Sequence, residues 1–194
     1  LVRTTFKKKR EALRDLLRSQ DIQNAVIFCN RKRDISTLLS SMKRHGFSAT
    51  GLHGDMTQSA RLAALDEFKN GQIPLLVASD VAARGLDIPS VSHVFNFDVP
   101  SNAEDYVHRI GRTGRAGRHG HAFTLIAGEE DEKAILAIEK LTGQPIPVVS
   151  NTDRQSKKEH LTDNAGKSAK KHRESRTSNK TTSDQLGQEE KNPD

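Results

Sequence analysis

Short apolar runs alternate along residues 1–150 with longer segments in which apolar residues recur every three or four positions. Uninterrupted apolar runs of this length are typical of strands buried on both faces of a parallel sheet. Alternation of such strands with helical segments predicts βαβ units, and hence an α/β fold with an open, mostly parallel sheet flanked by helices. The predicted strands are Ala25–Cys29, Ala49–Leu52, Leu75–Ala78, His93–Phe97 and Ala122–Ile126.

The segments between these strands have the spacing of amphipathic helices. Thr57 is a suitable N-cap for one helix, which Asn70 and Gly71 would end. Ser101 and Glu104 have the spacing of a capping box, which predicts that another helix begins there. Further helices are expected over Lys8–Arg18, Asp131–Leu141 and the segment with Ile35, Leu38, Leu39 and Met42 on one face, which Gly46 would end.

The chain changes character near Ser150. Residues 151–194 have too few apolar side chains to build a core, which predicts a disordered tail after a single domain over residues 1–150. Within the tail, Arg154–Lys180 has nine basic and three acidic residues, whereas Asp184–Asp194 has one basic and four acidic ones. This is a basic arm with an acidic tip, which could either bind phosphates or simply remain solvated.

Composition narrows the class of protein. The formal net charge is +6, which favours a polyanionic partner without identifying it. The single cysteine, Cys29, lies in an apolar run and excludes an internal disulfide; we expect a buried thiol. The histidines are too scattered for a metal site, and no apolar stretch is long enough to span a membrane, so we expect a cytoplasmic protein without a metal site of its own.

Arginine recurs every three residues in the run His108-Arg-Ile-Gly-Arg-Thr-Gly-Arg115. The planar, permanently charged guanidinium suits phosphate binding, so Arg109, Arg112 and Arg115 are candidates for that role. A basic turn that only contacts a nucleic-acid backbone or solvent has the same composition.

A second polar run, Ala78-Ser-Asp-Val-Ala-Ala-Arg-Gly-Leu-Asp87, directly follows a predicted strand. Its side chains should therefore emerge at the carboxyl edge of the sheet, where open α/β folds bind ligands. In isolation, Asp87 could equally be a turn residue and Arg84 an ordinary ion-pair partner.

Together these two runs resemble motifs V and VI of DEAD-box ATP-dependent RNA helicases of the bacterial type. Val26-Ile-Phe-Cys-Asn30 looks like motif IV, and His53-Gly-Asp-Met-Thr-Gln-Ser-Ala-Arg61 resembles the H-G-D and Gln-x-x-Arg elements. The resemblance extends over about residues 6–141 and implies the second RecA-like domain, a fold related to the P-loop NTPases.

The resemblance implies roles on the ATP side. Arg112 and Arg115 match the arginine fingers that reach the γ-phosphate of ATP held by the other domain. Asp87 matches the residue that contacts the ribose, with Gly85 beside it in the same motif. His108 matches a residue that couples the two domains.

The resemblance also implies an RNA side. Arg61, Gly54 and Ser79 match positions that contact the RNA backbone, and Arg84 matches a link between the RNA and ATP sides. Ser79 stands where the family usually has Thr, which keeps the hydroxyl. Arg31 stands where Thr is common, and it could add a phosphate contact or replace a specific hydroxyl bond.

The chain contains no G-x-x-x-x-G-K-[ST] loop and no D-E-A-D run. We therefore expect that ATP and Mg²⁺ are held mainly by an N-terminal RecA-like domain, and that this chain alone, as a monomeric fragment, does not hydrolyse ATP. As part of such a helicase it would serve local, ATP-driven unwinding of RNA duplexes. The alternatives are a stand-alone RNA-binding module and a DNA helicase or translocase of the same superfamily.

Overall fold

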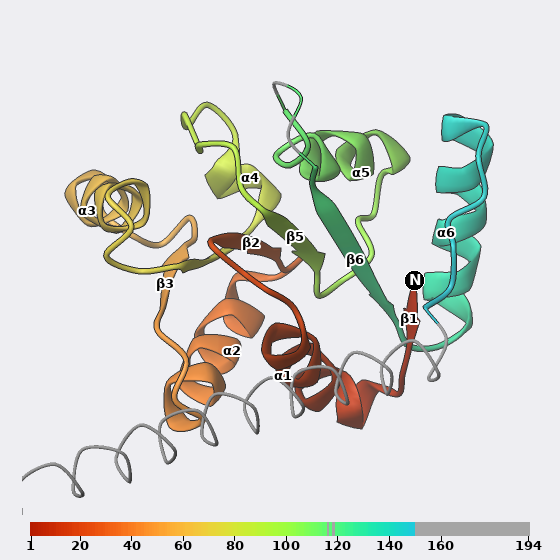
Figure 1. Ribbon diagram of the computed structural model, residues 1–194, viewed down its shortest axis with the longest axis horizontal. Helices are drawn as coiled ribbons and strands as arrows, with labels where there is room; N and C mark the ends of the chain where they lie inside the picture. The colour runs from red at the N-terminus through yellow and green to blue at the C-terminus, as the bar shows by residue number, and fades with distance from the viewer. Residues whose placement is uncertain (116, 118, 150–194) are drawn as a thin grey trace, which may run out of the picture. The chain divides into compact units, whose positions relative to one another are not determined.

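The computed structural model describes residues 1–115, 117 and 119–149, and it contains a six-stranded sheet of order β1-β6-β5-β2-β4-β3 in which every pair is parallel (Figure 1). The predicted α/β fold is confirmed. The strands are β1 (Val2–Arg3), β2 (Ala25–Phe28), β3 (Ala49–Leu52), β4 (Leu75–Ala78), β5 (His93–Asn96) and β6 (His121–Ile126).

Helices lie on both faces of this sheet. Figure 1 shows α1 and α2 on one face, α3, α4 and α5 on the other, and α6 beside β6. Because β2 and β4 are buried along their whole length, their residues are apolar without alternation, whereas β5 is equally buried but also contains His93 and Asn96. The helical elements are η1 (Phe6–Lys8), α1 (Lys9–Ser19), α2 (Lys32–Arg44), α3 (Gln58–Lys69), α4 (Asp80–Ala83), α5 (Ala103–Ile110) and α6 (Glu129–Thr142).

Two apolar layers sandwich the sheet. The layer beneath α1 and α2 includes Leu13, Ile35 and Phe95, and the layer beneath α3 and α4 includes Leu65 and Leu76. A third cluster joins α5 and α6 to the end of β6, and its members are Leu1, Val99, Tyr106, Ile126, Ile135 and Ile138. The carboxyl edge of the sheet is thereby held rigidly from both sides.

The helix ends follow the predicted chemistry in one case and differ in another. Thr57 Oγ1 accepts from the Ala60 amide at 3.3 Å, and Asn70 ends α3 with Gly71 at φ +70°, as predicted. The predicted capping box at Ser101 is wrong. Asn102 is the N-cap of α5 instead, and its side-chain oxygen accepts from the Glu104 amide at 3.1 Å. Serine and asparagine favour the N-cap position about equally, so residue type alone does not distinguish Ser101 from Asn102.

Two short elements have no counterpart in the sequence prediction. Strand β1 pairs with β6 and buries Val2 completely, although two residues are too few to show a period. Helix α4 is a single turn, which Ser79 caps with its hydroxyl. The predicted basic arm and acidic tip, residues 151–194, lie outside the described residues. No helix of the described part is long and apolar enough to cross a membrane.

The position of Cys29 generates a prediction. Its thiol is fully buried after β2, and this burial raises the thiol pKa well above its ordinary value, with the charges of Asp98 and Asp34 acting in the same direction. We expect iodoacetamide at pH 8 to label native Cys29 very slowly and the urea-unfolded chain rapidly, because only the exposed thiolate reacts.

The control for this prediction is Cys29→Ala carrying Ser40→Cys, which places a thiol at an exposed position of α2. Native labelling of the control should be fast. Equal labelling rates for native Cys29 and for the control thiol, measured by intact mass, would contradict the burial.

Candidate functional site

The carboxyl edge of the sheet collects polar residues from three central strands. Asn30 follows β2 closely, Ser79 and Asp80 follow β4, and Asp98 follows β5. Because the strands are parallel, these residues share one edge, which is where ligands bind in open α/β sheets.

The guanidinium of Arg109 lies at the centre of this edge. Its Nε and Nη2 donate to the two carboxylate oxygens of Asp80 at 2.7 and 2.6 Å. Nη2 also donates to Asn30 Oδ1 at 2.8 Å, and Nη1 donates to the Asp98 carbonyl at 2.7 Å and to Asn96 Oδ1 at 3.3 Å. Every donor of the fork is thereby used.

Arg109 is 1% exposed, and its guanidinium stacks over the Phe28 ring at 5.2 Å. It lies on the buried face of α5, three residues after the buried Tyr106. The expectation that all the arginines of this run are available to phosphate is therefore wrong for Arg109, whose donors are satisfied inside the protein.

The same network extends to α1 through Lys9. Its ammonium is buried and lies 3.2 Å from Asp98 and 3.5 Å from Asp131. Asp98 also accepts from the Asn30 amide at 3.1 Å. The carboxylate of Asp98 thus joins α1 to the loop that carries Asn30.

A pocket of about 310 Å³ opens beside Arg109. It brings together four of the predicted site residues, Arg84 and Gly85 from the loop after α4, and His108 and Arg112 from the end of α5. The remaining lining residues are Phe28, Asp80, Ala83, Asp105 and Arg109. Both arginine-bearing runs thus meet in one cavity, as expected for a phosphate site.

Two lining residues of the pocket form an ion pair. Arg84 Nη2 lies 2.6 Å from Asp105 Oδ1, and Asp105 is also 4.0 Å from Nδ1 of His108. The Arg84 side chain is 65% exposed, so the pair is solvated and can be exchanged at little cost.

The arginines predicted as fingers follow α5 directly. Arg112 is half-buried in the pocket wall, and within the described residues its guanidinium has neither a hydrogen bond nor a carboxylate partner. Arg115 is exposed outside the pocket lining, and its Nε donates to the Gly111 carbonyl at 2.6 Å. Arg112 therefore presents an unused charge inside the cavity.

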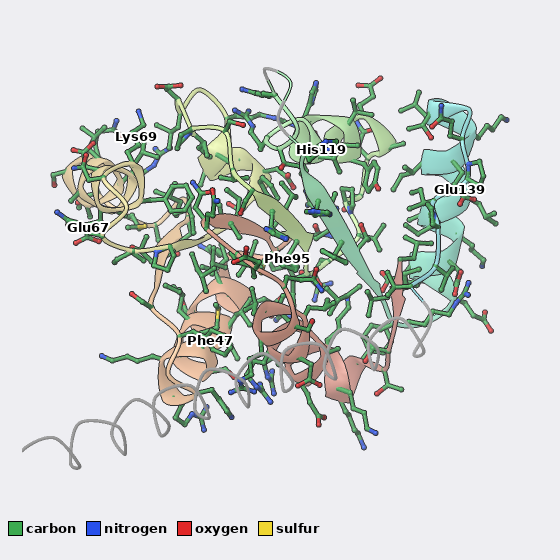
Figure 2. All side chains as sticks on the ribbon, viewed as in Figure 1. Phe47, Glu67, Lys69, Phe95, His119 and Glu139 are labelled. Carbon is green, nitrogen blue, oxygen red and sulfur yellow. The ribbon has the colours of Figure 1, made fainter. Side chains whose placement is uncertain are left out.

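Asp87 does not reach the pocket. Its carboxylate is 93% exposed and pairs with Lys69 of α3 at 3.0 Å. Asp87 thus lies on the same loop as Gly85 but outside the pocket, paired with a lysine that Figure 2 labels at the end of α3.

Residues predicted to contact RNA gather around α4. Arg61 Nη2 donates to the Ala82 carbonyl at 3.0 Å, and Ser79 accepts from the Ala82 amide at 3.4 Å. Among the described residues, the buried side-chain nitrogens without a hydrogen-bond partner are Nδ1 of His53 and Nε of Arg61. This group of side chains therefore retains unused polar capacity.

Gly54 and Arg31 lie in two loops that a neighbouring ion pair connects. Lys32 Nζ lies 2.8 Å from Asp55 Oδ1, and this hydrogen bond lowers the pKa of the Asp55 carboxyl. Arg31 is exposed at the N-cap position of α2, and Gly54 is exposed after β3. Both are open to solvent on the same edge as Ser79.

Sequence reasoning missed the residues that hold the site together. Asp80, Asn30 and Asp98 each follow a predicted strand within two residues, so their convergence at one edge could have been anticipated. Asp105 and Lys69 carry no comparable signal, because neither follows a predicted strand and charged residues are common on helices. Within the part of the chain that the structure describes, no group of three or more His, Cys, Asp or Glu could hold a metal ion.

Comparisons with known proteins agree with this geometry. The family model described as helicase conserved C-terminal domain matches residues 8–117. The DEAD-box ATP-dependent RNA helicase CshA of Bacillus licheniformis is 50% identical over 136 residues, which are 70% of this chain and 28% of that protein.

Solved structures of similar fold come from the same group of proteins. Escherichia coli SrmB, a DEAD-box protein bound to the regulator of ribonuclease activity RraA, is 34% identical with a TM-score of 0.72 over 79% of this chain and 90% of that chain. Saccharomyces cerevisiae Dbp5 bound to RNA and ADP BeF3 is 31% identical with a TM-score of 0.73 over 84% of this chain and 44% of that chain.

The Arg109 network makes a stability prediction. Replacing Arg109 with Met leaves Asp80 and Asn30 without their partner, and removing one member of a buried pair costs about 3–5 kcal/mol. We expect a loss of that size in the free energy of unfolding, measured by urea denaturation. Arg112→Met, which breaks no described bond, should change it by less than about 0.5 kcal/mol.

A double variant tests the cause. Because Arg109→Met/Asp80→Asn removes both charges, it should recover part of the loss seen in Arg109→Met alone. Equal stability of Arg109→Met and Arg112→Met would show that the buried network does not stabilise the fold.

Proposed function

The chain belongs to the DEAD-box RNA helicases, as their helicase conserved C-terminal domain, and from this premise we propose that it works as one half of an ATP-dependent RNA helicase. It spans 28% of the length of its Bacillus licheniformis relative. ATP hydrolysis and the local unwinding of RNA duplexes would belong to the longer protein, in which an N-terminal RecA-like domain holds ATP and Mg²⁺.

The proposal assigns Arg112 and Arg115 as arginine fingers. A finger must be positively charged at all pH values, lie at the edge of its own domain and remain unpaired until the nucleotide arrives. Arg112 meets these conditions in the pocket beside Arg109. Arg115 is exposed three residues further along the chain, and its side chain keeps one hydrogen bond to the Gly111 carbonyl. The unpaired guanidinium of Arg112 is the observation that carries the proposal.

The remaining ATP contacts come from the neighbouring loops. Asp87 would accept hydrogen bonds from the ribose hydroxyls, after exchanging its solvated pair with Lys69. Gly85 has φ +72°, which lets the loop turn beside the pocket without a side chain. His108, at the pocket mouth beside Asp105, would couple this domain to the ATP-bearing one.

RNA would bind on the α3–α4 side of the carboxyl edge. Arg61 and Ser79 present donors around α4, while Gly54 and Arg31 border the same edge. Arg84 would link the RNA side to the ATP side. Helix α4 has Ser79 of the RNA side as its N-cap, and Arg84, its C-cap, lines the pocket. Such backbone contacts would bind RNA without reading its sequence.

The finger assignment is tested by complementation. This chain, mixed with a separately made N-terminal domain of a DEAD-box helicase, should give RNA-stimulated ATPase activity. Arg112→Ala/Arg115→Ala should lower kcat by about 10³–10⁵-fold, because the charge developing on the γ-phosphate loses its partners.

The matched control is Lys133→Ala/Lys140→Ala, which removes two charges from exposed positions of α6. Its activity should equal that of the unchanged chain. Full stimulation by Arg112→Ala/Arg115→Ala would rule out the fingers, and RNA binding without any stimulation by the unchanged chain would favour a stand-alone binding module.

A further inference from the structure

A row of arginines lies on the face of the domain opposite α3 and α4. Arg10, Arg14 and Arg18 are four residues apart on α1, so they follow one side of the helix in steps of roughly 6 Å. Arg14 Nη1 lies 3.3 Å from the hydroxyl of Ser41 on α2, which shows that this side faces α2. The row therefore lies on the side of α1 next to α2, and the two helices contact each other.

The end of the row is pre-oriented. The guanidinium of Arg18 stacks over the ring of Phe47 at 5.2 Å, so one guanidinium face is held against the protein while the side chain remains exposed. Figure 2 labels Phe47 beside the end of α2 and shows side-chain nitrogens gathered beneath α1 and α2. A guanidinium plane fixed in this way is a platform on which an unpaired base can stack.

The arginines of the row form no ion pair, although α1 also carries Glu11 and Asp15. Within the described residues, Arg10, Arg14 and Arg18 have no carboxylate partner within 4.0 Å, in contrast to Arg84 and Arg109. Lys43 and Arg44, in the last turn of α2, are likewise without an acidic partner in that part of the chain. Arg14 and Arg18 are held by Ser41 and Phe47 without an ion pair, and the basic residues of this face outnumber Glu11 and Asp15, which indicates an anionic partner.

The chemistry of this face favours nucleic acid over a membrane or an apolar protein surface. None of the exposed large hydrophobic residues of the described chain belongs to α1 or α2. Insertion into a bilayer and docking against an apolar patch both need such residues. Planar guanidinium groups suit phosphodiesters, and the Arg18 platform suits single-stranded bases.

We propose that Arg10, Arg14 and Arg18 form a second contact surface for single-stranded RNA, on the opposite face of the sheet from Arg61. The inference depends on the proposed function in one respect, which is the choice of RNA as the anionic partner. This surface would bind a segment of the RNA that lies beyond the part bound at the carboxyl edge of the sheet. It would raise the affinity for RNA without taking part in ATP hydrolysis.

The test uses the full chain and a labelled single-stranded RNA, with affinity followed by fluorescence anisotropy over a series of salt concentrations. Arg14→Gln/Arg18→Gln should weaken binding and reduce the slope of log K against log salt by about 1.4, since each lost phosphate contact on a single strand removes about 0.7. Arg14→Lys/Arg18→Lys should restore the slope but not the full affinity, because Lys lacks the planar fork. The matched control Lys133→Gln/Lys140→Gln should leave the slope unchanged.

Several outcomes separate this surface from the proposed RNA site. Weaker binding in Arg14→Gln/Arg18→Gln with normal RNA-stimulated ATPase in the complemented enzyme at saturating RNA supports the surface, whatever Arg61→Gln does. Unchanged binding in Arg14→Gln/Arg18→Gln, with loss in Arg61→Gln, overturns the surface and leaves the proposed function intact.

Two further outcomes would also overturn it. The first is an equal loss in Lys133→Gln/Lys140→Gln, which would show that only net charge matters. The second is binding of polyglutamate that depends on Arg14 and Arg18 while RNA binding does not, which would identify an acidic protein as the partner. Failure of the unchanged chain to bind any RNA would overturn both this surface and the RNA part of the proposed function.

Discussion

A single buried guanidinium, that of Arg109, joins the polar ends of the central strands to the helix that carries the pocket. A charge at 1% exposure is tolerated only when it is paired and hydrogen-bonded. Here the partners come from three strand ends and include Asp80, Asn30 and the Asp98 carbonyl. Because these partners are far apart in the sequence, the network exists only when the sheet has its parallel order. The same hydrogen bonds of Arg109 therefore fix the geometry of the carboxyl edge and stabilise the fold.

This constraint explains which parts of the molecule the sequence could predict. The bounds of β3 and β4 follow from apolar runs, and those of α3 follow from Thr57 and Gly71, since local chemistry decides them. The distinction between Arg109 and Arg112 is not local in that sense. Both belong to one glycine-rich run, but Arg109 lies three residues after Tyr106 on the buried face of α5, whereas Arg112 follows the end of the helix at Gly111. Once the end of the helix is known, the spacing from Tyr106 identifies Arg109 as the buried structural arginine and leaves Arg112 available for a ligand.

The exposed ion pairs of the site have a different character. The pairs Arg84–Asp105 and Lys69–Asp87 are solvated, so each contributes little to stability. No pattern in the sequence identifies such partners, because many exposed charges could have formed them. Their weakness suits a binding site, because a ligand group can replace one partner of such a pair without a large loss of free energy. The buried network of Arg109 and the exchangeable Arg84–Asp105 pair thus line one pocket.

The sheet also separates two kinds of positive charge. On the α3–α4 face, Asp80 and Asp105 pair with Arg109 and Arg84 in the pocket, and Asp87 pairs with Lys69 outside it, so among these cations Arg112 is left without an ion pair. On the α1–α2 face, the three arginines of the row outnumber Glu11 and Asp15 on α1 and form no ion pair among the described residues. Long-range attraction depends on unbalanced charge, whereas selective contact depends on placed donors. A domain with this division can attract an anion with one face and hold its pocket residues on the other, because helices on both sides of the sheet keep the two faces in fixed relation.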